Sequence, residues 1–106
     1  MITIIIKYKG IKANARNFMK EMIDKGIVDK IRKEEGNLRY DYYLPIDDNN
    51  SIILIDSWIN QEALDKHHQL PLMKDISNLR IKYDLHMEVE KYQKIDDNKD
   101  DNYIRK

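Results

Sequence analysis

The chain has 106 residues and no cysteine, and its 19 basic residues balance 19 acidic ones, so its formal net charge is zero. This length suits one domain with one core, and the charge balance does not favour a nucleic-acid partner. The lack of cysteine excludes disulfides, zinc–thiolate sites, iron–sulfur clusters and thiol nucleophiles.

The first elements are a strand and a long helix. Residues 2–8 are rich in β-branched side chains, which predicts a strand. This apolar run is too short to span a membrane and lacks the features of a signal peptide, so a cytoplasmic protein without a membrane partner is expected. From 13 to 35 the apolar residues recur at helical spacing. Gly26 lies inside this predicted helix, where it permits close packing or a kink, and Gly36 is placed to end it.

A hairpin and a second helical region follow. Residues 37–46 alternate between apolar and polar, residues 47–51 (DDNNS) form a strong turn signal, and residues 52–59 predict a third strand. Asn60 is a good N-cap for a short helix through His68. Pro71 suits the start of another helical piece over 71–79.

The last predicted element is a strand over residues 81–92, in which Ile81, Tyr83, Leu85, Met87 and Val89 would form one buried face and polar residues the other. We therefore predict one domain over residues 1–92. The charged tail, residues 93–106, shows no periodicity and is predicted to be disordered.

The element order βαββαβ predicts an α+β, ferredoxin-like fold, with an antiparallel sheet covered by two helices on one face. The other face of the sheet needs a partner, because the third strand carries aliphatic residues on both of its faces. We therefore expect a homodimer in which two sheets pack face to face.

Four candidate side chains lie around the point where the third strand meets the next helix. Trp58 is either a packing residue or the wall of a pocket for a flat ligand. Asp56, two residues earlier on the same face, is either paired in a salt bridge or at a helix end, or reaches a cavity as its polar group. His67 and His68 are about 100° apart on a helix, which predicts that they do not serve one ligand, and spacing alone does not say which one faces the core.

Cofactor motifs are missing from the sequence. No histidine pair has metal-ligand spacing, and neither a glycine-rich phosphate loop nor a dinucleotide fingerprint is found. We expect a protein without a metal or another cofactor.

The stretches EEGNLRYDYY and IILIDSWINQEALDKH, with the opening strand and helix, resemble the antibiotic biosynthesis monooxygenase family over about residues 1–92. The family pattern falls on Glu34, Gly36, Tyr40, Asp56, Trp58, Ala63, Leu64 and His67. The chain departs from it in two places: Asp56 stands where the family usually has Glu, and Leu70-Pro71-Leu72 lacks the second histidine that many members carry.

The resemblance implies a homodimeric α+β barrel that oxygenates small, electron-rich aromatic molecules such as quinols without metal or flavin. His67 would be the catalytic base, with Trp58, Tyr40 and Asp56 binding the substrate. One alternative is a non-catalytic dimeric module that binds a small ligand or acts in a stress response. A second is a haem-degrading monooxygenase, although the first strand lacks the Asn of those enzymes and the second helical region lacks their Trp.

Overall fold

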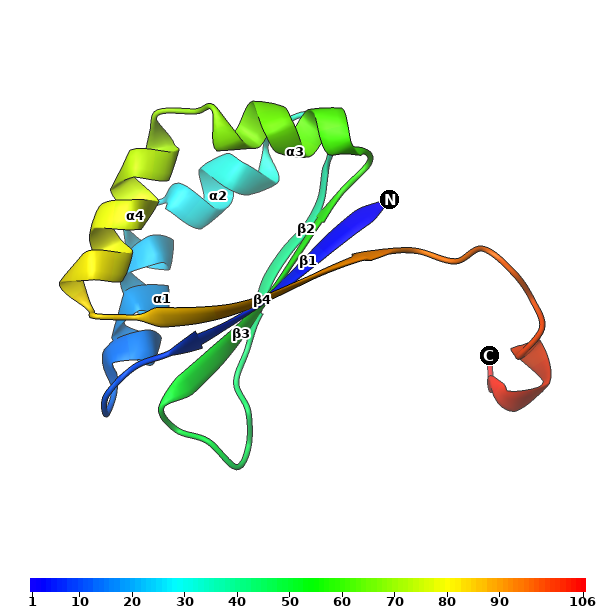
Figure 1. The fold of residues 1–106 in the computed structure, drawn as a ribbon, viewed down its shortest axis with the longest axis horizontal. Coiled ribbons are helices and arrows are strands. Elements are labelled where there is room, and N and C mark those ends of the chain that lie inside the picture. Colours follow the sequence, from blue (N-terminus) through cyan, green and yellow to red (C-terminus); the bar gives the residue numbers. More distant parts are fainter.

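The structure is a computed structural model that describes residues 1–106. It contains four strands and four α-helices, followed by one short 3-10 helix (Figure 1). In chain order these are β1 (Ile2–Lys9), α1 (Asn14–Asp24), α2 (Ile27–Arg32), β2 (Asn37–Tyr43), β3 (Ser51–Trp58), α3 (Gln61–His68), α4 (Leu72–Lys82), β4 (His86–Gln93) and η1 (Asp101–Tyr103).

The four strands form one antiparallel sheet in the order β2-β3-β1-β4. The two central strands, β1 and β3, come from the two halves of the chain, which is the arrangement of a ferredoxin-like fold. The predicted fold class is therefore confirmed, and so is the antiparallel pairing of the two strands that flank the DDNNS turn.

The core lies between the sheet and the helices, which all cover the same face (Figure 1). Alternate residues of β1 point into it, since Ile2, Ile4, Ile6 and Tyr8 are buried while their neighbours are more exposed. On β3 the even-numbered residues share this face, which brings Asp56 and Trp58 into the same interior. A carboxyl group thus enters an otherwise apolar layer.

The predicted helix over 13–35 is wrong as a single element, because it is divided at Gly26. Gly26 has a φ of 74°, a left-handed conformation that starts a new helix in a new direction. Gly36 follows with a φ of 85°, as predicted for the residue that ends the helical region. It also has a packing role, since a Cβ atom there would lie 2.6 Å from Cβ of Ala63 on α3.

The predicted strand over 81–92 begins too early, because α4 continues to Lys82 and β4 starts only at His86. Ile81 lies on the outside of α4, with 75% of its surface exposed. The predicted buried face of this strand is also wrong for the single chain: Met87 and Val89 are on the helix side of the sheet but stay exposed, because the helices do not reach across β4.

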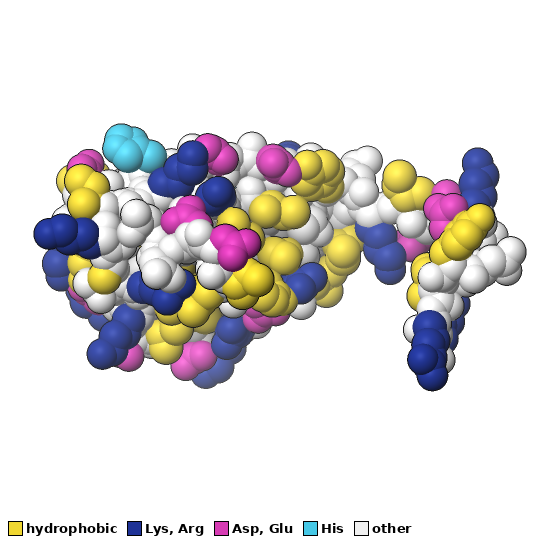
Figure 2. Space-filling view, turned by 90° about the horizontal axis from the view of Figure 1, so that it is seen from below, with side chains coloured by type: hydrophobic (Ala, Val, Ile, Leu, Met, Phe, Trp, Pro, Cys, Tyr) yellow, Lys and Arg dark blue, Asp and Glu magenta, His cyan; other side chains and the backbone are white.

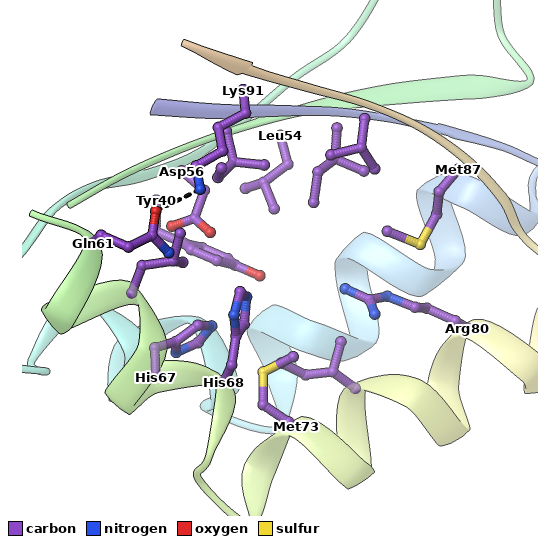
Figure 3. Close-up of a pocket in the computed structure, with 15 residues that line it drawn as sticks. Tyr40, Leu54, Asp56, Gln61, His67, His68, Met73, Arg80, Met87 and Lys91 are labelled. Carbon is purple, nitrogen blue, oxygen red and sulfur yellow. Dashed lines mark hydrogen bonds between the residues drawn. The ribbon is translucent and has the colours of Figure 1, made fainter. Parts of the chain in front are cut away.

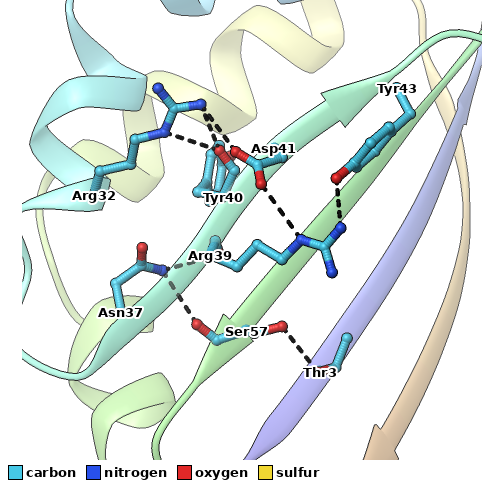
Figure 4. A network of polar contacts seen from close by, with 8 residues as sticks. All are labelled: Thr3, Arg32, Asn37, Arg39, Tyr40, Asp41, Tyr43 and Ser57. Atoms are coloured by element: carbon cyan, nitrogen blue, oxygen red, sulfur yellow. Dashed lines mark hydrogen bonds and ion pairs between the residues drawn. The ribbon is translucent and has the colours of Figure 1, made fainter. Parts of the chain in front are cut away.

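The face of the sheet turned away from the helices has a mixed character, and a view of the molecule from below shows apolar and charged side chains side by side (Figure 2). Ile53 and Ile55 lie half-buried on it. Toward the β2 edge, Arg39 and Asp41 form an ion pair with a distance of 3.4 Å, and Asp41 also pairs with Arg32 at 3.2 Å (Figure 4).

Beyond β4 the chain runs away from the sheet and forms η1 shortly before its end (Figure 1). Disorder of this tail stays a prediction. None of the helices combines the length and apolar character that a membrane-crossing segment needs.

Candidate functional site

A cavity of about 270 Å³ lies between the sheet and the helices α3 and α4 (Figure 3). Nine of its 15 lining residues are hydrophobic. The other six are Asp56, Gln61, His67, His68, Arg80 and Lys91, and Tyr40, counted among the nine, adds a hydroxyl group. A mostly apolar lining with a few polar groups is the usual character of a small-molecule site, and this volume suits a ligand of one or two rings.

His67 is held on two sides. Its Nδ1 lies 3.0 Å and 2.9 Å from the two carboxylate oxygens of Glu34, which comes from the end of the α2 region. The indole of Trp58 packs against the imidazole with ring centroids 4.7 Å apart. Because a carboxylate only accepts hydrogen bonds, Nδ1 carries the proton and donates it to Glu34. In this tautomer Nε2 is the nitrogen without a proton, and it makes no hydrogen bond within the chain.

Asp56 is the acidic group in the cavity lining, and it is 5% exposed. Its Oδ1 atom is buried without a hydrogen-bond partner. Burial raises the pKa of Asp56 to about 7, and the nearby negative charge of Glu34 acts in the same direction. The nearby indole N–H of Trp58 acts in the opposite direction and lowers this pKa, although Trp58 Nε1 has no hydrogen-bond partner in the structure. Asp56 can therefore exchange a proton near neutral pH.

Tyr40 is opposite Asp56 in the pairing of β2 with β3, and its hydroxyl group points into the cavity (Figure 3). Burial raises the pKa of this phenol well above its usual value, with the hydroxyl of Tyr42 as the next cause. Tyr40 consequently stays protonated at neutral pH and can donate a hydrogen bond to a ligand.

The chain matches a known protein family. The family model described as antibiotic biosynthesis monooxygenase matches residues 1–79. The chain belongs to this family. The comparison with curated proteins gives no match.

Solved structures share the antibiotic biosynthesis monooxygenase fold at low sequence identity. A Deinococcus radiodurans protein with the same family description superposes with a TM-score of 0.80 at 15% identity, covering 92% of this chain and 95% of its own. Protein PA3566 from Pseudomonas aeruginosa gives a TM-score of 0.75 at 20% identity, covering 89% and 93%. SnoaB, a cofactor-independent oxygenase from Streptomyces nogalater, gives 0.74 at 12% identity, covering 91% and 94%.

Residues of the antibiotic biosynthesis monooxygenase pattern meet around His67. Glu34 binds its ring, Trp58 packs on it, and Gly36 lies against the α3 residue Ala63. Asn60 caps α3, as predicted, by accepting a hydrogen bond of 2.9 Å from the backbone N–H of Ala63. The pattern thus describes the contacts that fix α3, and with it His67, against the sheet.

The structure brings Tyr40, Asp56 and His67 together in the cavity lining but not Trp58, which is fully buried behind His67. His67 and His68 both line this cavity, with ring centroids 5.6 Å apart (Figure 3). That they do not serve one ligand stays a prediction.

Sequence reasoning missed three features of this site. The pairing of Glu34 with His67 joins residues that are far apart in the chain. Arg80 and Lys91 line the cavity without having been predicted there. A signal existed for Arg80, which follows buried Ile76 by four positions and therefore lies on the inner face of α4.

Proposed function

We propose that this protein is a cofactor-independent monooxygenase that oxidises a small, quinol-like aromatic substrate with dioxygen. The observation that carries the proposal is the meeting of a carboxylate-bound imidazole and a buried, titratable carboxyl group at one mostly apolar cavity. A binding module without chemistry would be expected to fill its interior and leave His67 in solvent. His67 is instead 4% exposed and lines the cavity, which favours the enzyme.

His67 is the proposed base. With Nδ1–H donated to Glu34, its Nε2 removes a proton from a substrate hydroxyl group, and Glu34 stabilises the imidazolium that results. The phenolate then transfers an electron to dioxygen, and the two radicals combine to form a peroxide on the substrate carbon. Loss of water from this peroxide gives a hydroxyquinone, so that quinol and dioxygen yield hydroxyquinone and water. The substrate itself supplies the electrons.

Asp56 and Tyr40 are the proposed binding groups. The protonated carboxyl of Asp56 and the phenol of Tyr40 both donate hydrogen bonds to oxygen atoms of the substrate, and the carboxyl can supply a proton to the oxygen that leaves as water. Trp58 contributes by fixing the ring of His67 from behind. Its predicted part in substrate binding is therefore indirect in this proposal.

The reaction is tested by supplying the purified protein with a panel of benzoquinols and naphthoquinols in an oxygen electrode. We expect oxygen uptake above the protein-free rate, in equal amounts with substrate consumed. With isotopically labelled dioxygen, one atom should enter the product and the other should enter water. Uptake no faster than autoxidation with every quinol would reject the proposal and favour the binding module, while release of hydrogen peroxide in place of labelled product would indicate an oxidase.

We also propose that the working protein is a homodimer that packs the uncovered sheet faces together. Ile55, which is opposite Ile5 of β1 in the centre of that face, is half-buried with no helix above it. A stable interface would bury about 1,200–2,000 Å². We expect a dimer by light scattering at micromolar concentration, and a monomer for Ile55→Lys, because the substitution would bury an unpaired charge.

The matched control is Ile81→Lys, which makes the same change on the exposed side of α4 and should remain a dimer. Monomeric wild-type protein at this concentration would remove the dimer from the proposal.

A further inference from the structure

Positive charge in the cavity lining is not balanced by acids. Arg80 and Lys91 line the cavity, and neither forms an ion pair with a carboxylate. Asp56 is the acidic residue of the lining, and burial favours its neutral form. At neutral pH the lining therefore carries a net positive charge, although the whole chain is neutral. A ligand with a negative charge would gain from this field.

Arg80 is held in a fixed orientation. Its Nε and Nη2 donate hydrogen bonds of 3.2 Å and 2.9 Å to the hydroxyl oxygen of Tyr8 on β1. Nη1 makes no hydrogen bond within the chain, and Nη2 has a second N–H group. The edge of the guanidinium group that carries Nη1 and Nη2 therefore keeps free donors. The side chain extends from α4 into the cavity (Figure 3). Such a planar pair of donors matches the two oxygens of a carboxylate.

The remaining cations have different surroundings. Lys91 on β4 reaches toward α3 and donates a hydrogen bond to the side-chain amide of Gln61, so its charge stays free (Figure 3). His68 points into the cavity between these groups, and its partial burial and the neighbouring His67 lower its pKa, which keeps it neutral near pH 7. Arg80 is thus the best-oriented anion partner, and the wall around it includes the apolar side chains of Ile76 and Met87.

We propose that the cavity selects an aromatic acid: the ring lies among the apolar side chains, and a carboxylate on the ring is bound by the free end of the Arg80 guanidinium group. This names the substrate class of the proposed oxygenase and rests on that function for turnover, but not for binding. A hydrogen bond between two charged groups contributes more than a neutral one, so the carboxylate should matter by about tenfold or more in affinity.

The test compares 2,5-dihydroxybenzoate with its neutral amide, 2,5-dihydroxybenzamide, by isothermal titration calorimetry without dioxygen, so that binding is measured apart from turnover. We expect wild-type protein to bind the carboxylate at least about tenfold more tightly than the amide. Arg80→Gln should bring this ratio close to one. Arg80→Lys, which keeps the charge but loses the planar pair of donors, should give an intermediate ratio.

Lys74→Gln is the control, because it removes one positive charge from an exposed position on the same helix and should leave the ratio unchanged. Circular dichroism of each variant checks that the loss of the Tyr8 contact has not unfolded the chain, and Arg80→Lys still gives a test if Arg80→Gln does unfold. Equal affinity for the two probes, no detectable binding of the carboxylate at millimolar concentration, or a ratio unchanged in both Arg80 variants would overturn the inference. Binding of the carboxylate without oxygen uptake would reject the oxygenase and leave the inference standing.

Discussion

The free energy of unfolding of Asp56→Asn, measured relative to that of the wild-type protein, is expected to increase by about 4 kcal/mol between about pH 4 and about pH 9. The pKa of this carboxyl is raised from 3.8 to about 7 by burial in the folded protein. The folded state therefore holds the proton more tightly than the unfolded chain does. The free energy of unfolding of the wild-type protein is highest when Asp56 is protonated, and it falls as the pH rises from the pKa of the unfolded chain toward that of the folded protein. Each unit of difference between the two pKa values corresponds to about 1.4 kcal/mol. Asparagine has a similar shape and does not ionise.

Urea denaturation of both proteins at a series of pH values measures this difference. Asp47→Asn, at an exposed position in the loop between β2 and β3, is the matched control and should follow the wild-type protein at every pH. If the stabilities of wild type and Asp56→Asn run parallel over the whole range, Asp56 ionises normally in the folded protein. The variant should also bind a quinol with less dependence on pH.

A His67→Asn variant is expected to consume oxygen with a quinol about 100-fold more slowly than the wild-type protein, which is the scale for loss of one general base. Asparagine is preferable to alanine here. His67 is buried between Glu34 and Trp58, and alanine would leave a hole and an unpaired carboxylate. The amide N–H of asparagine can replace Nδ1–H as the donor to Glu34, but it cannot accept a proton from the substrate.

The control for this variant is His86→Asn, since His86 is exposed at the start of β4 and does not line the cavity. His68 cannot serve, because its ring lies in the same cavity as that of His67. Equal oxygen uptake by wild type and His67→Asn would exclude His67 as the base and leave Asp56 as the next candidate.

Most of the fold could be predicted because the signals that set it are local. Turn residues mark the hairpin, Asn60 marks the start of α3, and Gly36 marks the end of the first helical region. The errors occurred where a pattern fits two structures equally well. Ile81, Tyr83 and Leu85 alternate like a strand, yet Ile81 lies on the outside of α4 and the chain turns only at Asp84, which has a φ of 49°.

The site was less predictable, because its geometry depends on contacts between distant parts of the chain. The sequence placed Asp56 and Trp58 on one face of a strand, and the structure agrees. It could not indicate that Glu34 would bind Nδ1 of His67, or that the side chain of Trp58 would stand behind that ring and away from the cavity surface. These outcomes follow from how α3 packs on the sheet, which no short stretch of sequence encodes.

The contact between Trp58 and His67 makes Trp58 an intrinsic fluorescent probe of the site. Trp58 is the one tryptophan of the chain, so ultraviolet emission excited at the red edge of protein absorption comes from this position alone. Its indole lies 4.7 Å, between ring centroids, from an imidazole that lines the cavity. We therefore expect the intensity and lifetime of that emission to change when the ring of His67 moves, so that stopped-flow fluorescence can follow ligand binding at the site without a label.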